Sequence, residues 1–325
     1  MTRLLHIPEI KDFWRASAAC LLGFATFAGL GARCADQQPA PAEPVTGCVA
    51  LPEFGASVQF RLYTNAAPDA AHLFNSVEIV AQGRTLLRCP TGDGLKRWRA
   101  SASPDPRIHG IMLDGEGPGL DATNSMVVAG TAAGNGWKFV ALDARRAYAN
   151  RVVEFERGIL FVEPDLFVVH DHLVAEQPRQ FRVSLQVPSS AGIDPIWGDV
   201  RIATEEGASV LVHAPSFQKQ PRRWERVETE AAGFFENTAT MQLGPTNKVA
   251  RLDLLTVYAV NPKGGHREYA FRLLEGNGAI GARIHRDGLP TLVAFKTDPA
   301  MSHPTVTGFG FDGPVGVDVF RPKPR

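Results

Sequence analysis

A histidine stands at the head of the stretch RIHGIMLDGEGP, residues 107–118, and is the first candidate for acid–base or metal chemistry. The imidazole of His109 changes charge near neutral pH, and its nitrogens can carry a proton or bind a metal ion. The same stretch is also typical of an apolar strand that runs into an acidic, glycine-rich turn. His109 is therefore either a functional residue or part of a strand-to-turn connection.

Two further histidines, His170 and His172, stand two positions apart in VVHDHLV. Because side chains alternate between the two faces of a strand, both histidines share one face and Asp171 points to the other. Two histidines at this spacing can share a zinc ion, with Asp143 or His213 as a conceivable third ligand. The alternative is the polar face of an exposed strand, which binds no metal.

Two stretches combine basic and aromatic side chains. LKRWRA contains Arg97 and Trp98, and QKQPRRWERVE contains Arg222, Arg223 and Trp224. Arginine holds carboxylate or sulfate groups through two parallel hydrogen bonds, and a tryptophan ring can stack on a sugar. Both stretches predict contacts with an acidic polysaccharide. The alternative is a strand with a charged outer face.

Other residues with chemical potential are better explained by structure. Asp114 and Glu116 are two acids in one tight turn, where they rarely face each other across a substrate, so we interpret them as turn residues. We interpret Tyr148 as a core tyrosine with a hydrogen-bonded hydroxyl. The sequence contains no phosphate-binding loop, nucleophile elbow, dinucleotide fingerprint or zinc-protease motif.

The elements that would position these residues are almost all strands. QFRVSLQVP alternates, with Phe181, Val183, Leu185 and Val187 on one face. RVVEFERGILFVEPDLFVVHDHLVA predicts three consecutive strands, divided at Gly158 and at Pro164-Asp165. Helical periodicity is weak and confined to residues 68–80. The sequence therefore predicts an all-β protein, a large antiparallel β-sandwich or supersandwich of many strands with few or no helices after its N-terminal segment.

The N-terminal residues are typical of a signal peptide, predicted over residues 1–35. A basic region with Arg3, Lys11 and Arg15 precedes an apolar stretch, AACLLGFATFAGLGA, and an uncleaved anchor is the alternative. Residues 36–47 form a Pro/Ala-rich spacer, and residues 48–325 form the folded domain. We expect a periplasmic or secreted protein without a membrane span after cleavage. Cys48 and Cys89 form a disulfide or remain free thiols.

The composition argues against some partners. Basic and acidic residues number 34 each among 325 residues, so the formal net charge is zero. A chain without net charge has no general attraction to nucleic acid, and we expect no nucleic-acid partner.

Residues 107–187 resemble the C-terminal β-sandwich domain of the heparinase II/III-like polysaccharide lyases. The resemblance rests on RIHGIMLDGEGP, on DARRAY from Asp143 to Tyr148, on the hairpin RGILFVEPD from Arg157 to Asp165, and on VVHD ending at Asp171. The order of these segments is more specific than any one of them.

The resemblance implies β-elimination on a uronate-containing acidic polysaccharide, with a histidine from the sandwich and, in some members, a zinc site. Most of the family's catalytic apparatus lies on a helical toroid. About 70 residues separate the signal peptide from the first family-like stretch, and they lack the pattern of such a toroid. When the Asp114-Gly115 turn is aligned, Ile108 takes the place of the family's histidine, and a shift of one residue changes the face of a strand.

Two functions remain open from the sequence. One is a lyase-like enzyme in which His109 is the acid–base group and a separate helical-toroid subunit completes the site. The other is a non-catalytic module that binds acidic glycan through its basic stretches.

Overall fold

The computed structural model describes thirteen parts of the chain: residues 48–51, 58–63, 77–81, 84–87, 110–117, 127–148, 151–193, 199–205, 207–214, 224–227, 238–245, 247–262 and 268–319. Within these residues the only helix is the short 3-10 helix η3 (Arg145–Tyr148). No helix in this part of the chain is long and apolar enough to cross a bilayer. All pairings between its strands are antiparallel, which confirms the predicted all-β antiparallel sandwich.

The central sheet has eight strands in the order β11-β12-β13-β16-β9-β8-β7-β6. Their bounds are β6 (Val127–Gly134), β7 (Trp137–Asp143), β8 (Glu154–Val162), β9 (Leu166–Arg179), β11 (Gly192–Ile193), β12 (Val200–Ala203), β13 (Ser209–His213) and β16 (Val249–Asn261). Strands β8, β9 and β16 lie next to one another, and β9 carries His170 and His172.

Three smaller sheets accompany the central one among the described residues. The outer sheet has the order β21-β20-β17-β18-β19-β22, the β10 sheet has the order β14-β15-β10-β5, and the N-terminal sheet has the order β1-β2-β3-β4. The outer strands are β17 (Tyr269–Asn277), β18 (Ala279–Arg286), β19 (Leu289–Lys296), β20 (Thr305–Val306), β21 (Phe309–Gly310) and β22 (Val315–Val319). The others are β1 (Cys48–Leu51), β2 (Val58–Tyr63), β3 (Val77–Ala81), β4 (Arg84–Leu87), β5 (Gly110–Leu113), β10 (Phe181–Pro188), β14 (Glu225–Val227) and β15 (Thr238–Leu243).

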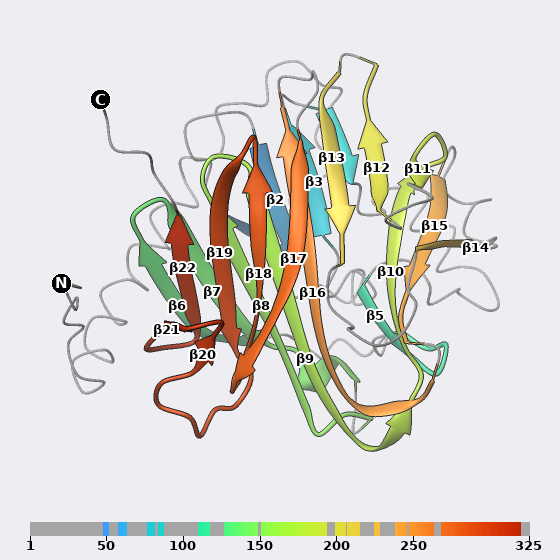
Figure 1. Ribbon diagram of the computed structural model, residues 1–325. Helices are drawn as coiled ribbons and strands as arrows, with labels where there is room; N and C mark the ends of the chain where they lie inside the picture. The colour runs from blue at the N-terminus through green and yellow to red at the C-terminus, as the bar shows by residue number, and fades with distance from the viewer. Residues whose placement is uncertain are drawn as a thin grey trace, which may run out of the picture. The chain divides into compact units, whose positions relative to one another are not determined.

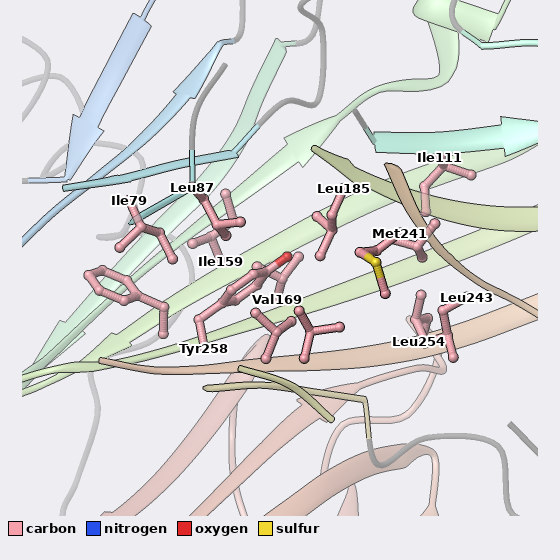
Figure 2. Packing of buried hydrophobic residues seen from close by; sticks show 14 of the residues in the cluster. Ile79, Leu87, Ile111, Ile159, Val169, Leu185, Met241, Leu243, Leu254 and Tyr258 are labelled. Atoms are coloured by element: carbon pink, nitrogen blue, oxygen red, sulfur yellow. The ribbon is translucent and has the colours of Figure 1, made fainter. Parts of the chain in front are cut away.

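Both faces of the central sheet are buried. On one face, side chains such as Ile159, Val169 and Tyr258 pack against the β10 and N-terminal sheets, and Figure 2 shows this cluster. On the other face, side chains such as Leu160 and Val168 pack against the outer sheet. In Figure 1 the outer strands β17, β18, β19 and β22 lie in front of β7, β8 and β9. Strands buried on both faces explain the nearly continuous apolar runs of β8 and β9.

The alternation predicted for QFRVSLQVP is confirmed in β10. Phe181, Val183, Leu185 and Val187 belong to the core between the central and β10 sheets. The opposite face of β10 is polar but also largely buried, and Gln186 donates a hydrogen bond from Nε2 to Thr240 Oγ1 at 2.7 Å. Pairing with a neighbouring strand satisfies these buried polar groups.

One weak pattern and one local prediction differ from the structure. Residues 77–80, at the end of the weak helical pattern, form part of β3, which pairs with β2 and β4. Backbone pairing on both sides of a strand outweighs a weak helical pattern. Gly158 does not divide two strands but lies inside β8, opposite Ala141 and His170. A side chain there would approach the ring of Phe139, so glycine is explained by close packing.

Candidate functional site

Part of the predicted site lies outside the described residues. This applies to Arg97, Trp98, His109, Arg222 and Arg223, and to Cys89 of the conceivable disulfide. Strand β5 begins at Gly110, whose φ of 93° is in the left-handed region that favours glycine.

His170 and His172 share a carboxylate that the sequence did not indicate. His172 Nδ1 donates a hydrogen bond to Asp253 Oδ1 at 2.7 Å, and His170 Nε2 approaches the same oxygen at 3.3 Å. The other carboxylate oxygen, Oδ2, accepts a hydrogen bond from Arg251 Nε at 3.1 Å. Asp253 lies in β16 and is directly opposite His172 in β9. Strand pairing across 81 residues of sequence thus forms the cluster.

The electrostatics of this cluster favour an ion pair. Burial alone would raise the pKa of Asp253, but the hydrogen bonds from both histidines hold it well below its usual value. Burial alone would lower the pKa of His172, but its hydrogen bond to Asp253 raises it above its usual value. A protonated His172 beside an ionised Asp253 is therefore favoured over the neutral pair.

The cluster also joins two sheets. The His170 ring lies 5.1 Å from the ring of Phe295 in β19, measured between centroids. Arg251 Nη2 donates a hydrogen bond to the carbonyl oxygen of Thr297, just after β19, at 3.0 Å. His170 is only 4% exposed at its side chain. The pair of histidines is thus largely enclosed between the central and outer sheets and is not the exposed polar face of the alternative interpretation.

The described residues do not complete the predicted zinc site. Of the conceivable third ligands, His213 pairs with Asp199, and Asp143 accepts a hydrogen bond from the backbone N–H of Arg145 at 2.9 Å. Among the described residues, no group of three or more His, Cys, Asp or Glu side chains is arranged to hold a metal ion.

The surroundings of His172 are acidic. The register aligns Asp143, Glu156, His172 and Asp253 across four neighbouring strands, so their side chains share one face. Glu154 Oε2 also lies 3.5 Å from His172 Nε2. Carboxylates in this arrangement repel uronate and sulfate groups. The geometry therefore favours a role inside the fold over acid–base chemistry on an acidic polysaccharide.

Conspicuous residues of the family-like segments form a buried polar core on the opposite face. Arg157 and Asp171 make a two-point ion pair, and their side chains are 3% and 2% exposed. Tyr148 donates its hydroxyl hydrogen to the carbonyl oxygen of Ile111 at 2.7 Å, which confirms the predicted core tyrosine. Burial raises the pKa of the Tyr258 hydroxyl, which keeps this nearby phenol neutral. These side chains stabilise the sandwich and do not reach solvent.

The acidic turn is held by ion pairs, as predicted for turn residues. Asp114 accepts hydrogen bonds from the backbone N–H of Gln180 and from Arg179, and these lower its pKa. Glu116 accepts a hydrogen bond from Arg151 at 2.9 Å. The two carboxylates therefore bind different arginines and do not face each other.

Trp224 is buried in the structure, whereas the sequence predicted that its ring contacts a polysaccharide. It is 2% exposed and belongs to the core that contains Met241 and Leu243. Its indole N–H has no hydrogen-bond partner among the described residues. A ring buried to this extent cannot stack on a sugar, so the predicted binding role of Trp224 is replaced by a packing role.

Comparison with known proteins supports the fold. No family model matches the chain, and no curated protein matches it. Among solved structures, it is similar to the heparan sulfate lyase HepC of Pedobacter heparinus, with 15% identity, a TM-score of 0.60 and coverage of 88% of this chain and 48% of that chain. It is also similar to a heparinase III, with 14% identity, a TM-score of 0.56 and coverage of 77% and 41%. This chain thus spans less than half of each lyase, and the likeness shows a polysaccharide-lyase-related β-sandwich fold.

Proposed function

We propose that this protein is the sandwich component of a lyase that acts on uronate-containing acidic polysaccharide. The observation that carries the proposal is the match of 88% of the chain to a heparan sulfate lyase. In this proposal a helical-toroid subunit supplies the remaining catalytic groups, since the resemblance assigns most of them to a toroid.

The proposed reaction is a β-elimination. A base takes the proton from C5 of a uronate residue, and the electron pair left on C5 forms the double bond to C4. The bond from C4 to the leaving oxygen breaks, and that oxygen takes a proton from an acid. His109 would carry one of these protons, while Arg97, Arg222 and Arg223 would bind the acidic groups of the polysaccharide.

The test combines purification with an optical assay. The full chain is isolated from its native extract and incubated with heparan sulfate and other acidic polysaccharides, and the absorbance of an unsaturated uronate is followed. We expect a helical lyase subunit to co-purify, and we expect the signal to disappear in His109→Ala but to persist in the exposed control His303→Ala. A protein that stays monomeric in its native extract and yields no signal would refute the proposal.

A non-catalytic module that binds acidic glycan is the second candidate. It is favoured by the burial of Arg157, Asp171 and Tyr148, because these residues of the family-like segments serve the core. The Arg222→Glu/Arg223→Glu variant should then lose salt-sensitive binding to heparan sulfate. The matched control is Arg272→Glu/Arg283→Glu, which changes the same charge on the outer sheet. Equal binding by both variants and the parent protein would exclude the module.

The same proposal includes export. Sequencing the N-terminus of the mature protein from its native cell should find a start near the end of the predicted signal peptide, residues 1–35. Recovery of the intact N-terminus in a cytoplasmic fraction would contradict export.

A further inference from the structure

A small pocket lies between the central and outer sheets, away from the histidine cluster. The space between its lining residues, including the adjoining open solvent, is about 250 Å³. The polar side chains in its lining are Arg201 from β12, Ser209 from β13, Asn261 from β16 and Tyr269 from β17, and Leu211 and Ala259 are among its apolar lining residues.

Strand register explains why these side chains meet. Ser209 is directly opposite Asn261, and Leu211 is directly opposite both Arg201 and Ala259. Directly paired residues point to the same face of a sheet, and residues two positions apart on a strand do so as well. All five therefore lie on the face of the central sheet that the outer sheet covers, where Leu211 and Ala259 join the core against that sheet.

The lining carries one positive charge and no carboxylate. Arg201 is exposed, and among the described residues it makes no hydrogen bond or ion pair. Asp199, two residues earlier in the chain, is paired with His213, so it is not available to neutralise Arg201. The His213 ring is in turn stacked on Phe271, with centroids 4.2 Å apart, which fixes this pair beside the pocket.

We propose that this pocket binds an oxyanion, either a carboxylate or a sulfate group, through Arg201. The guanidinium of Arg201 presents two parallel donors to such a group, and the hydroxyl of Ser209 can donate a further hydrogen bond. The pocket is small and partly open to solvent, so it suits contact with a single acidic group and not a whole organic ligand. The site lies apart from His109 and the two basic stretches in sequence and does not depend on the proposed lyase function.

The test is an NMR titration of the isotopically labelled full chain with sodium sulfate, with glucuronate and with neutral glucose. We expect saturable shifts of the Ser209, Leu211 and Asn261 amides with the two anions and none with glucose. The tighter of the two anions identifies the group that the pocket prefers.

Arg201→Gln should weaken anion binding by at least about tenfold, because it removes a charge-assisted contact while leaving an exposed side chain of similar length. The control Arg272→Gln removes an exposed arginine of β17 that has no partner among the described residues, and it should bind as the parent protein does. Thermal unfolding verifies that both variants are folded.

Three results would overturn the site: no saturable shift with either anion, unchanged binding by Arg201→Gln, or an equal loss in Arg272→Gln, which would indicate unspecific charge attraction. The polysaccharide assays measure lyase activity and glycan binding, which are separate from sulfate binding in the pocket. Loss of lyase activity and glycan binding with intact sulfate shifts would refute the proposed function alone, and the reverse pattern would refute the pocket alone.

Discussion

The guanidinium of Arg157 donates two hydrogen bonds to the carboxylate of Asp171, from Nε to Oδ1 at 2.5 Å and from Nη2 to Oδ2 at 2.9 Å. The two residues are directly opposite each other in β8 and β9. Burial alone would lower the pKa of Arg157, but the charge of Asp171 and its hydrogen bonds raise it, so the guanidinium stays charged inside the core. Both residues belong to the segments that resemble the lyases. Because the two side chains form a buried ion pair between neighbouring strands, these segments are characteristic of the fold.

Removal of one partner should be far more costly than removal of both. Arg157→Met leaves a buried carboxylate unpaired, and we expect it to lower the free energy of unfolding by about 3–5 kcal/mol. The double variant Arg157→Met/Asp171→Leu should lose less free energy of unfolding than the two single variants lose together. Urea unfolding of the four proteins measures this coupling. Strict additivity of the two single losses would contradict a buried, mutually dependent pair.

Gly158→Ala should destabilise the interface between the central and outer sheets. A Cβ atom at Gly158 would lie 2.9 Å from Phe139 Cε2 and 3.4 Å from Phe295 Cδ1. Overpacking of this kind costs about 1–3 kcal/mol. The matched control is Gly130→Ala in β6, where a Cβ meets nothing within 4 Å. Equal thermal unfolding temperatures for the two variants would show that the aromatic rings move aside without cost.

Asp253→Asn should remove a pH-dependent contribution to stability. The folded pKa of Asp253 is lowered, so its contribution is present above its unfolded pKa and is lost as the pH falls through the folded value. The folded pKa of His172 is raised, so its contribution is present below its unfolded pKa and is lost as the pH rises through the folded value. The ion pair therefore stabilises the protein most between about pH 4 and pH 6.5.

The measurement is urea unfolding at several pH values. We expect Asp253→Asn to lose about 1.5–3 kcal/mol near pH 5.5, the usual worth of a hydrogen bond to a charged group, and less near pH 8.5. Asp318→Asn, at an exposed acid of β22, is the control and should unfold as the parent protein does. A loss in Asp253→Asn that is the same at both pH values would argue against a titrating ion pair.

Trp224 should behave as a core residue. Trp224→Ala is expected to lower the free energy of unfolding by about 3–5 kcal/mol, and Trp224→Phe by clearly less, because the indole N–H makes no hydrogen bond in the structure. Urea unfolding ranks the two variants. If Trp224→Phe instead kept full stability but lost affinity for heparan sulfate, the ring would be a sugar-binding residue.

Some of these features could be predicted from local patterns in the sequence. Apolar residues at every second position, such as Phe181 and Val183, predicted the inner face of β10. The acidic, glycine-rich stretch that contains Asp114 predicted the turn. Each depends on residues within one element, where side-chain direction follows from the period of the strand. The match between prediction and structure is closest there.

Features that depend on pairing between distant strands were not predicted. Nothing near His172 in the sequence indicates Asp253, because the two meet only when β9 pairs with β16. The mixed basic and aromatic composition around Trp224 suggested a surface, whereas Trp224 is buried in the core cluster that contains Met241 and Leu243 of β15. The glycine at 158 marks close ring packing and not a turn, which a single sequence does not distinguish.

The pairing of β9 with β16 also bears on how quickly the chain reaches its native state. Ten residue pairs join these neighbouring strands in the middle of the central sheet, although Leu166 and Ala259 at one end are far apart in the chain. A long loop must close before this pairing contributes any stabilising contact, and proteins dominated by such distant contacts fold in about milliseconds to seconds, not microseconds. Slow refolding, limited by the meeting of two remote strands, is thus a consequence of the arrangement that brings Asp253 to its histidines.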